Sequence, residues 1–278
     1  MTWNIQIGQN RSGFILANEK ENFFNRKGFF KSAIPALIII ILLSLVCNSD
    51  FLLPGNEAAT KRDAFLVLCA CIWNGLFNSI QTICKEREII KHEHRAGMYL
   101  SSYILGYAGF DFFICLLNSF ITWLVVVIKF FPNISESGAV FPRALGYLIT
   151  FIIVTYAADA LGILVSSIVK TPDMAMKVMP FILIIELAFS NVLLTLPKFL
   201  DKVSWLTFGK WGTQAFLDIA YYFGKGGISL NFSVREHMFA SEVEYAGFIL
   251  SWGAMLVFIV VSLLLAMVFL RSVDKDQR

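Results

Sequence analysis

The ionisable side chains of this chain are densest in one run, from Lys85 to Arg95. Of 278 residues, 57% are hydrophobic and only 15% are charged, whereas soluble domains carry roughly 25% charged residues. The run mixes lysine, arginine, glutamate and histidine, so it must lie in water or among lipid headgroups. It contains no proline and is followed by Gly97, which predicts a short charged helix on the membrane surface. An ordinary loop whose charges only fix the topology is the alternative.

No pattern in the sequence predicts chemistry on the chain itself. The Walker A pattern of nucleotide-binding loops, the GxSxG nucleophile turn and the HExxH zinc motif do not occur in it. His92 and His94 are two positions apart, so they would not share a helical face and do not predict a metal site. We therefore expect no catalytic residue, no metal and no cofactor on this chain. Five cysteines in or beside apolar runs are interpreted as packing residues: Cys47, Cys69, Cys71, Cys84 and Cys115.

Amide side chains form a stripe within one apolar run. Asn74, Asn78 and Gln81 are spaced by four and three residues, so they share one face of a helix. Trp73 and Phe77 lie on a different face of that helix. The amides could pair with a neighbouring helix as packing contacts, or they could line a path for a substrate. The residues alone leave both interpretations open.

Glu186 and Asp159 are acids within other apolar runs. Glu186 shares a helical stripe with Ile182 and Phe189, and a charge at mid-membrane costs roughly 2.5–3.5 kcal/mol. Glu186 should therefore be protonated, partnered or wetted by a cavity. For Asp159 we expect pairing between helices.

Six apolar runs, each near the ~20 residues that a helix needs to cross a bilayer, predict an all-helical polytopic membrane protein. They extend from about Ser32 to Leu53, Ala64 to Cys84, Ser102 to Ile128, Ala144 to Val169, Val178 to Leu196 and Tyr245 to Leu270. Residues 32–270 would then form one membrane domain, and residues 271–278 a cytoplasmic tail. Residues 1–31 interleave apolar with basic side chains, which predicts an amphipathic surface segment. A partly disordered tail is the alternative there.

An even number of spans puts both ends of the chain on one side of the membrane. That side would also hold residues 85–97, and it is richer in lysine and arginine than the other side. Basic residues are more frequent in cytoplasmic loops, so we predict cytoplasmic termini and a multi-pass protein of the cell membrane, surrounded by lipid. The net charge of +3 is spread over the segment ends, so no nucleic acid partner is expected.

Residues 197–244 lie on the opposite side of the membrane in this topology. The segment is rich in tryptophan, phenylalanine and tyrosine, and its apolar stretch from Ala215 to Phe223 is too short to span a bilayer. Aromatic residues gather at membrane interfaces. We therefore expect short helices that dip into the outer interface before the last span.

The charged run also carries a recognisable pattern. Glu86, Glu93, Gly97 and Tyr99 form E-x6-E-x3-G-x-Y, and residues 101–106 follow as Ser-Ser-Tyr-Ile-Leu-Gly. Together these residues resemble the coupling-helix region of G-subfamily ABC transporters, which are type-2 (ABC-2 type) exporters. Residues 161–180 also resemble the pattern of type-2 permeases, so the resemblance covers most of the chain.

This resemblance implies a permease that exports a hydrophobic or amphipathic substrate, such as a lipid, drug or peptide. It implies two partners: an ABC ATP-binding subunit that carries ATP and Mg, and a second copy of the chain or a similar permease. Residues 85–97 would be the coupling helix, residues 1–31 a connecting helix, and residues 197–244 a re-entrant outer region. The residues expected to couple to the ATPase are Glu86, Arg87, His92, Glu93, Gly97 and Tyr99. Those expected along the substrate path are Asn74, Phe77, Asn78, Glu186, Phe189 and Leu193.

Two other classes of function stay open. An ion-coupled secondary transporter or channel would use Glu186 or Asp159, although the sequence shows no internal repeat of the kind that such transporters often have. A non-transporting protein, such as an immunity or sensory factor, would not need a charged inner helix. Co-purification with an ATP-binding protein distinguishes the permease from both.

Overall fold

The computed structural model describes residues 37–41, 45, 57–135, 140–190, 202–222 and 247–271. Within these ranges every regular element is helical and none is a strand, so the predicted all-helical fold is confirmed for this part of the chain. The predicted amphipathic segment over residues 1–31 lies outside the described residues, and so do most of the first predicted span and residues 223–246.

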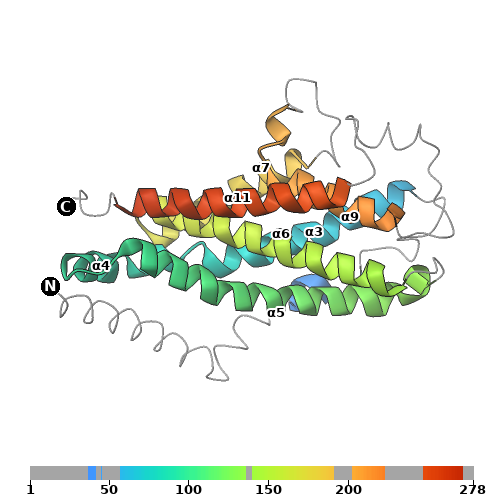
Figure 1. Cartoon of the computed structure of the whole chain (residues 1–278), viewed down its shortest axis with the longest axis horizontal. Helices are drawn as coiled ribbons and strands as arrows, with labels where there is room; N and C mark the ends of the chain where they lie inside the picture. Colours follow the sequence, from blue (N-terminus) through green and yellow to red (C-terminus); the bar gives the residue numbers. More distant parts are fainter. Residues whose placement is uncertain are drawn as a thin grey trace.

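The described helices form an elongated bundle (Figure 1). In chain order they are α3 (Glu57–Ser79), α4 (Thr82–Arg95), α5 (Leu100–Ser135), α6 (Val140–Ile168), α7 (Pro172–Ala188), α9 (Phe208–Tyr222) and α11 (Gly247–Leu270). The short helix α4 lies at the end of the bundle where α11 also ends (Figure 1). A helix therefore forms where the charged run predicted one.

Four helical stretches are long and apolar enough to cross a membrane: Arg62–Arg95, Leu100–Phe130, Ala144–Ile168 and Ile249–Leu270. They correspond to the second, third, fourth and sixth predicted spans. The helix α7 has 17 residues and ends at Ala188, and residues 191–196, where the predicted fifth span continues, lie outside the described residues. The total of six spans therefore stays a prediction.

The helices of the bundle divide into inner and outer ones. In the most apolar 18 residues of each stretch, the protein itself buries 72% for Arg62–Arg95 and 61% for Ala144–Ile168. The buried share is only 39% for Leu100–Phe130 and 28% for Ile249–Leu270. The exposed faces of α5 and α11 are hydrophobic, as contact with lipid requires. Within the described residues, α3 and α6 therefore form the interior of the bundle, whereas α5 and α11 have exposed apolar faces.

The central helix α6 packs against α3, α5, α9 and α11. Its buried face includes Ala157, Ala158 and Ala160, and these small side chains allow neighbouring helices to come close. A Cβ atom on Gly75 of α3 would lie only 2.2 Å from the carbonyl oxygen of Thr155. The backbones of α3 and α6 are thus in contact at a point where only glycine fits.

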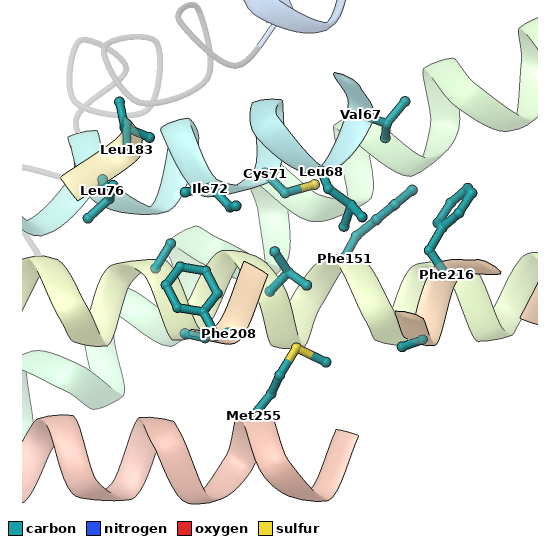
Figure 2. Packing of buried hydrophobic residues seen from close by; sticks show 14 of the residues in the cluster. Val67, Leu68, Cys71, Ile72, Leu76, Phe151, Leu183, Phe208, Phe216 and Met255 are labelled. Carbon is teal, nitrogen blue, oxygen red and sulfur yellow. The ribbon is translucent and has the colours of Figure 1, made fainter. Parts of the chain in front are cut away.

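The largest hydrophobic cluster lies between α3, α6, α9 and α11 (Figure 2). The ring of Phe216 on α9 stacks on Tyr147 of α6 with 4.5 Å between the ring centroids, and Phe208 is fully buried. Leu68 and Ile72 of α3 reach the same cluster. The helix α9 therefore packs into this cluster over its described side chains, and its position at the outer interface stays a prediction.

A second hydrophobic cluster lies at the α4 end of the bundle. It joins Ile83 and Ile90 of α4 to residues of α5 and α6 and to Ala266 and Leu270 of α11. Ile90 is 1% exposed, whereas its neighbour Ile89 is 56% exposed. Only one side of α4 is thus anchored on the bundle, and the other side is left open.

Candidate functional site

The helix α4 ends at a glycine, as the sequence predicted. Gly97 has a φ of +99°, a left-handed conformation that L side chains rarely adopt. The N–H of Gly97 donates to the carbonyl oxygen of His94 at 2.9 Å, and the N–H of Met98 donates to that of Glu93 at 3.1 Å. These bonds satisfy carbonyl groups that a helix end leaves without partners, as glycine helix ends commonly do. The chain then turns directly into α5.

Glu86 ties α4 to the first turns of α5. Its Oε2 atom accepts a hydrogen bond from the hydroxyl group of Tyr103 at 2.6 Å, and Tyr103 is only 7% exposed. Hydrogen bonds to a carboxylate are among the stronger ones in proteins. Glu86 therefore has a partner inside the chain, on the helix that follows.

Arg87 ties α4 to the end of α6. Its guanidinium group donates to the carbonyl oxygens of Ser167 at 3.3 Å and Val169 at 3.1 Å. The last carbonyl groups of a helix lack helical partners and carry partial negative charge, so a cation there is favourable. The backbone N–H of Cys84 also donates to Ser166 Oγ at 3.1 Å, and its thiol donates to the Ser166 carbonyl oxygen at 3.1 Å. We call these contacts the α4–α6 clasp.

The remaining coupling residues, His92, Glu93 and Tyr99, differ in their exposure. His92 is exposed, and Tyr99 is 71% exposed. The Oε2 atom of Glu93 is buried and finds no hydrogen-bond partner among the described residues. We define the α4 surface as the exposed residues Ile89, His92, Arg95 and Tyr99. It combines apolar, aromatic and charged groups on a helix that is fixed at both ends, which is a suitable surface for a protein partner.

The amide stripe of α3 faces α6 rather than the outside of the chain. Asn78 donates from Nδ2 to Oδ1 of Asp159 at 2.9 Å, and Ser79 donates from Oγ to the carbonyl oxygen of Asp159 at 2.7 Å. Asn74 is only 5% exposed. Pairing between helices, which was one interpretation of Asn78 and the expected role of Asp159, is confirmed for these two residues.

The aromatic residues of α3 are the exposed ones. Trp73 and Phe77 are each 42% exposed, and their ring centroids are 5.3 Å apart. On the neighbouring helix α7, Phe181, Ile184 and Ile185 are also exposed. Of the residues predicted along the substrate path, Phe77 is thus the one whose side chain reaches furthest out of the chain within the described ranges.

Glu186 joins α7 to the beginning of α9. It is 5% exposed, and its Oε2 atom accepts a hydrogen bond from the backbone N–H of Gly209 at 2.9 Å. The first N–H groups of a helix lack helical partners and carry partial positive charge, so a carboxyl oxygen is favourable there. A Cβ atom on residue 209 would lie 2.8 Å from the carbonyl oxygen of Glu186. Glycine at this position therefore permits the close approach.

Two residues of the predicted substrate path follow Glu186 in the chain, and the structure describes only the first of them. Phe189 is partly buried just after the last residue of α7, and Leu193 lies outside the described residues. A second contact lies nearby: the Thr213 hydroxyl oxygen of α9 is 3.2 Å from the carbonyl oxygen of Ser190, and it is 2.8 Å and 3.0 Å from the carbonyl oxygens of Lys210 and Gly209 in its own helix. We call the Glu186–Gly209 and Ser190–Thr213 contacts together the α7–α9 clasp.

Sequence reasoning missed both clasps. Cys84 was interpreted as a packing residue and Arg87 as a contact to the ATPase. Ser166 was noted only within residues 161–180, which resemble the type-2 permease pattern, and Gly209 was not singled out. Cys84 and Ser166 are 82 positions apart, so no local pattern connects them. The feature of the sequence that could have indicated these contacts is the group of polar residues at the ends of the apolar runs. Within the described ranges, no group of histidine, cysteine, aspartate and glutamate is arranged to hold a metal ion.

Comparison with protein families gives a match over most of the chain. A family model described as ABC-2 type transporter matches residues 15–221. This range covers more than half of the chain and includes α3, α4, α5, α6, α7 and both clasps. No curated protein sequence matches the chain significantly.

Proposed function

Because the chain belongs to the ABC-2 type transporter family, we propose that it is the permease subunit of an exporter driven by a separate ATP-binding subunit. The observation that carries this proposal is the placement of α4. This charged helix is anchored to α5 by Glu86 and to α6 by Arg87, yet it presents the α4 surface to the outside. A helix that is fixed to several spans and open on one side can take up force from a partner.

In this proposal the α4 end of the bundle faces the cytoplasm. Lysine and arginine are concentrated in residues 85–95, and basic residues favour the cytoplasmic side of a membrane. The ATP-binding subunit would bind ATP and Mg and would contact the α4 surface, with Glu93 as a further contact. Residues 1–31, the proposed connecting helix, would contact the same ATP-binding subunit.

The substrate path of the proposed exporter would run along the exposed residues of α3 and α7, between two copies of the chain. Phe77 and Trp73 offer aromatic rings for contact with a hydrophobic or amphipathic molecule. Asn74, Asn78 and Glu186 would support the wall of this path, since their side chains are buried or bonded to neighbouring helices. Phe189 and Leu193 would lie toward its outer end.

Co-purification tests the proposed function. The chain, carrying an affinity tag, is expressed in its native membrane and isolated in mild detergent. We expect an ABC ATP-binding protein to be isolated with it and the complex to hydrolyse ATP. The same complex in liposomes should transport only when ATP is present on the side of the ATPase. Transport by the chain alone, driven by an ion gradient, would overturn the proposal in favour of a secondary transporter.

A further inference from the structure

The helix α7 packs on the described part of the bundle with one of its sides. Its buried residues are Ala175, Met179, Leu183 and Glu186, which recur at helical spacing on one side. On the opposite side Phe181 is 68% exposed. Since only one side of α7 is packed, the contacts at its two ends also contribute to its position.

The first end of α7 is held through the α4–α6 clasp. Only residues 169–171 separate the last residue of α6 from Pro172, the first residue of α7. Arg87 donates to the carbonyl oxygen of Val169 within this link at 3.1 Å, and Cys84 Sγ lies 3.3 Å from the same oxygen. Thr171 then caps α7 by accepting from the N–H of Met174 at 3.4 Å. A displacement of α4 therefore reaches α7 across very few residues.

The second end of α7 is held through the α7–α9 clasp. Glu186 and Ser190 contact the first turns of α9, at Gly209 and Thr213. The lack of a Cβ atom at Gly209 brings the two backbones together. Between the clasps α7 is one continuous helix of 17 residues, about 25 Å long at 1.5 Å per residue. Pro180 lies on its exposed side.

We propose that α7 is a rod that transmits the movement of α4 to α9, with Arg87 and Glu186 as the positioning residues at its two ends. This inference rests on the proposed function, because it takes the ATP-binding subunit to move α4. It assigns a second route for the force, besides the direct continuation of α4 into α3 and α5. The movement would reach α9, whose Phe216 is stacked in the core beside α6.

Hydrogen–deuterium exchange on the complete complex tests the rod. The permease with its ATP-binding subunit is compared without nucleotide and with a non-hydrolysable ATP analogue and Mg²⁺. In the wild-type complex we expect the exchange rate to change in two peptides, one over residues 84–97 and one over residues 205–215. The second change should be roughly two- to thirtyfold, the range that follows from gaining or losing one helix cap.

Two variants interrupt the rod at opposite ends. Arg87→Met keeps the aliphatic stem but removes the donors to Ser167 and Val169, and Lys85→Met is its control because Lys85 is exposed on the same helix. Glu186→Leu removes the acceptor for Gly209. Glu186→Gln provides an amide oxygen that can accept the same hydrogen bond from Gly209. If Glu186→Leu fails to fold, the rod is tested by comparing Arg87→Met with Lys85→Met.

The exchange rates of these variants support or contradict the rod. We expect Arg87→Met and Glu186→Leu to abolish the nucleotide-dependent change over residues 205–215 while keeping the change over residues 84–97. The Lys85→Met and Glu186→Gln variants should behave as the wild type. An undiminished change over residues 205–215 in both Arg87→Met and Glu186→Leu would overturn the rod alone, and so would no change there in the wild type. If nucleotide changed neither peptide of the wild type, the role of α4 in the proposed function would fail, and the rod with it.

Discussion

At the scale of single residues, glycine and small polar side chains fix the position of α3 against α6. A Cβ atom on Gly75 would overlap the carbonyl oxygen of Thr155, and one on Gly162 would lie 2.2 Å from Ser79 Oγ. Lipid is as apolar as leucine, so the hydrophobic effect does little to bring two helices together in a membrane. Close packing and the hydrogen bonds to Asp159 therefore decide this contact.

Gly75→Ala should lower the free energy of unfolding by about 1–3 kcal/mol, because the added methyl group forces the two helix backbones apart. Gly109→Ala on α5 is the matched control, since a Cβ atom there meets nothing within 4 Å. It should be neutral or stabilising, as alanine favours helix over glycine. Thermal unfolding of the purified protein in detergent measures both. Equal melting temperatures for the two variants would argue against this packing.

The pair of Asn78 and Asp159 can be tested by a double-mutant cycle. Asn78→Leu removes the donor at 2.9 Å and leaves a buried carboxyl oxygen without it, at a cost of about 1–3 kcal/mol. Replacing both residues, as Asn78→Leu with Asp159→Leu, should recover part of this loss, because two apolar side chains leave no unpaired polar group. The measurement is the same unfolding assay. Strictly additive losses would show that the two residues are not coupled.

The sequence predicted the polar residues of this contact but not all their partners. Buried amides in an apolar run tend to pair between helices, so pairing of Asn78 and Asp159 was foreseeable. The bond between Glu186 and Gly209 was not, because glycine has no side chain whose chemistry indicates a contact. Whether Asn74 and Phe77 meet a substrate stays a prediction.

At the scale of elements, helix ends were best predicted where a residue with special backbone properties sits. Gly97 was expected to end α4 and does so. By contrast, the fifth span was expected to begin near Val178, where the apolar run starts, whereas α7 begins at Pro172. Thr171, Pro172 and Asp173 are a cap, a first-turn proline and a first-turn acid, and these signals outweigh hydropathy in setting a helix start.

Substitution of Gly97 separates backbone conformation from packing at the end of α4. No atom lies within 4 Å of a Cβ placed there, so only the positive φ opposes a side chain. Gly97→Val should destabilise the helix end by about 1–2 kcal/mol, and Gly97→Asn should do so less, because asparagine tolerates this conformation. Amide exchange over residues 90–98 measures the effect. Equal exchange rates in the two variants would count against the described turn.

At the scale of the whole molecule, the described part of the chain has a large exposed apolar surface. Part of it, on α5 and α11, suits lipid, but Trp73 and Phe77 on α3 lie on one of the two inner helices of the bundle. A second copy would cover these rings and enclose a path between the copies. This arrangement belongs to the proposed function and has a direct test.

Native mass spectrometry of the complex, released from lipid nanodiscs, should show two permease chains together with two ATP-binding subunits. Phe77→Ala should reduce transport while preserving this assembly, because the ring would contact the substrate rather than hold the fold. Leu124→Ala, an exposed residue of α5, is the control and should leave transport unchanged. A single permease chain, under conditions in which transport survives, would refute the pairing.

The central claim is that the α4 surface receives force from the ATP-binding subunit, and binding of that subunit tests it most directly. The affinity of the ATPase is measured for the wild type, for Ile89→Ala with Tyr99→Ala, and for Leu206→Ala, which truncates an exposed apolar residue just before α9. We predict that the double variant lowers the affinity by about thirtyfold or more, as loss of central contact residues does, and that ATP-driven transport falls with it. Leu206→Ala should bind like the wild type. Wild-type affinity and transport in the double variant would contradict the account.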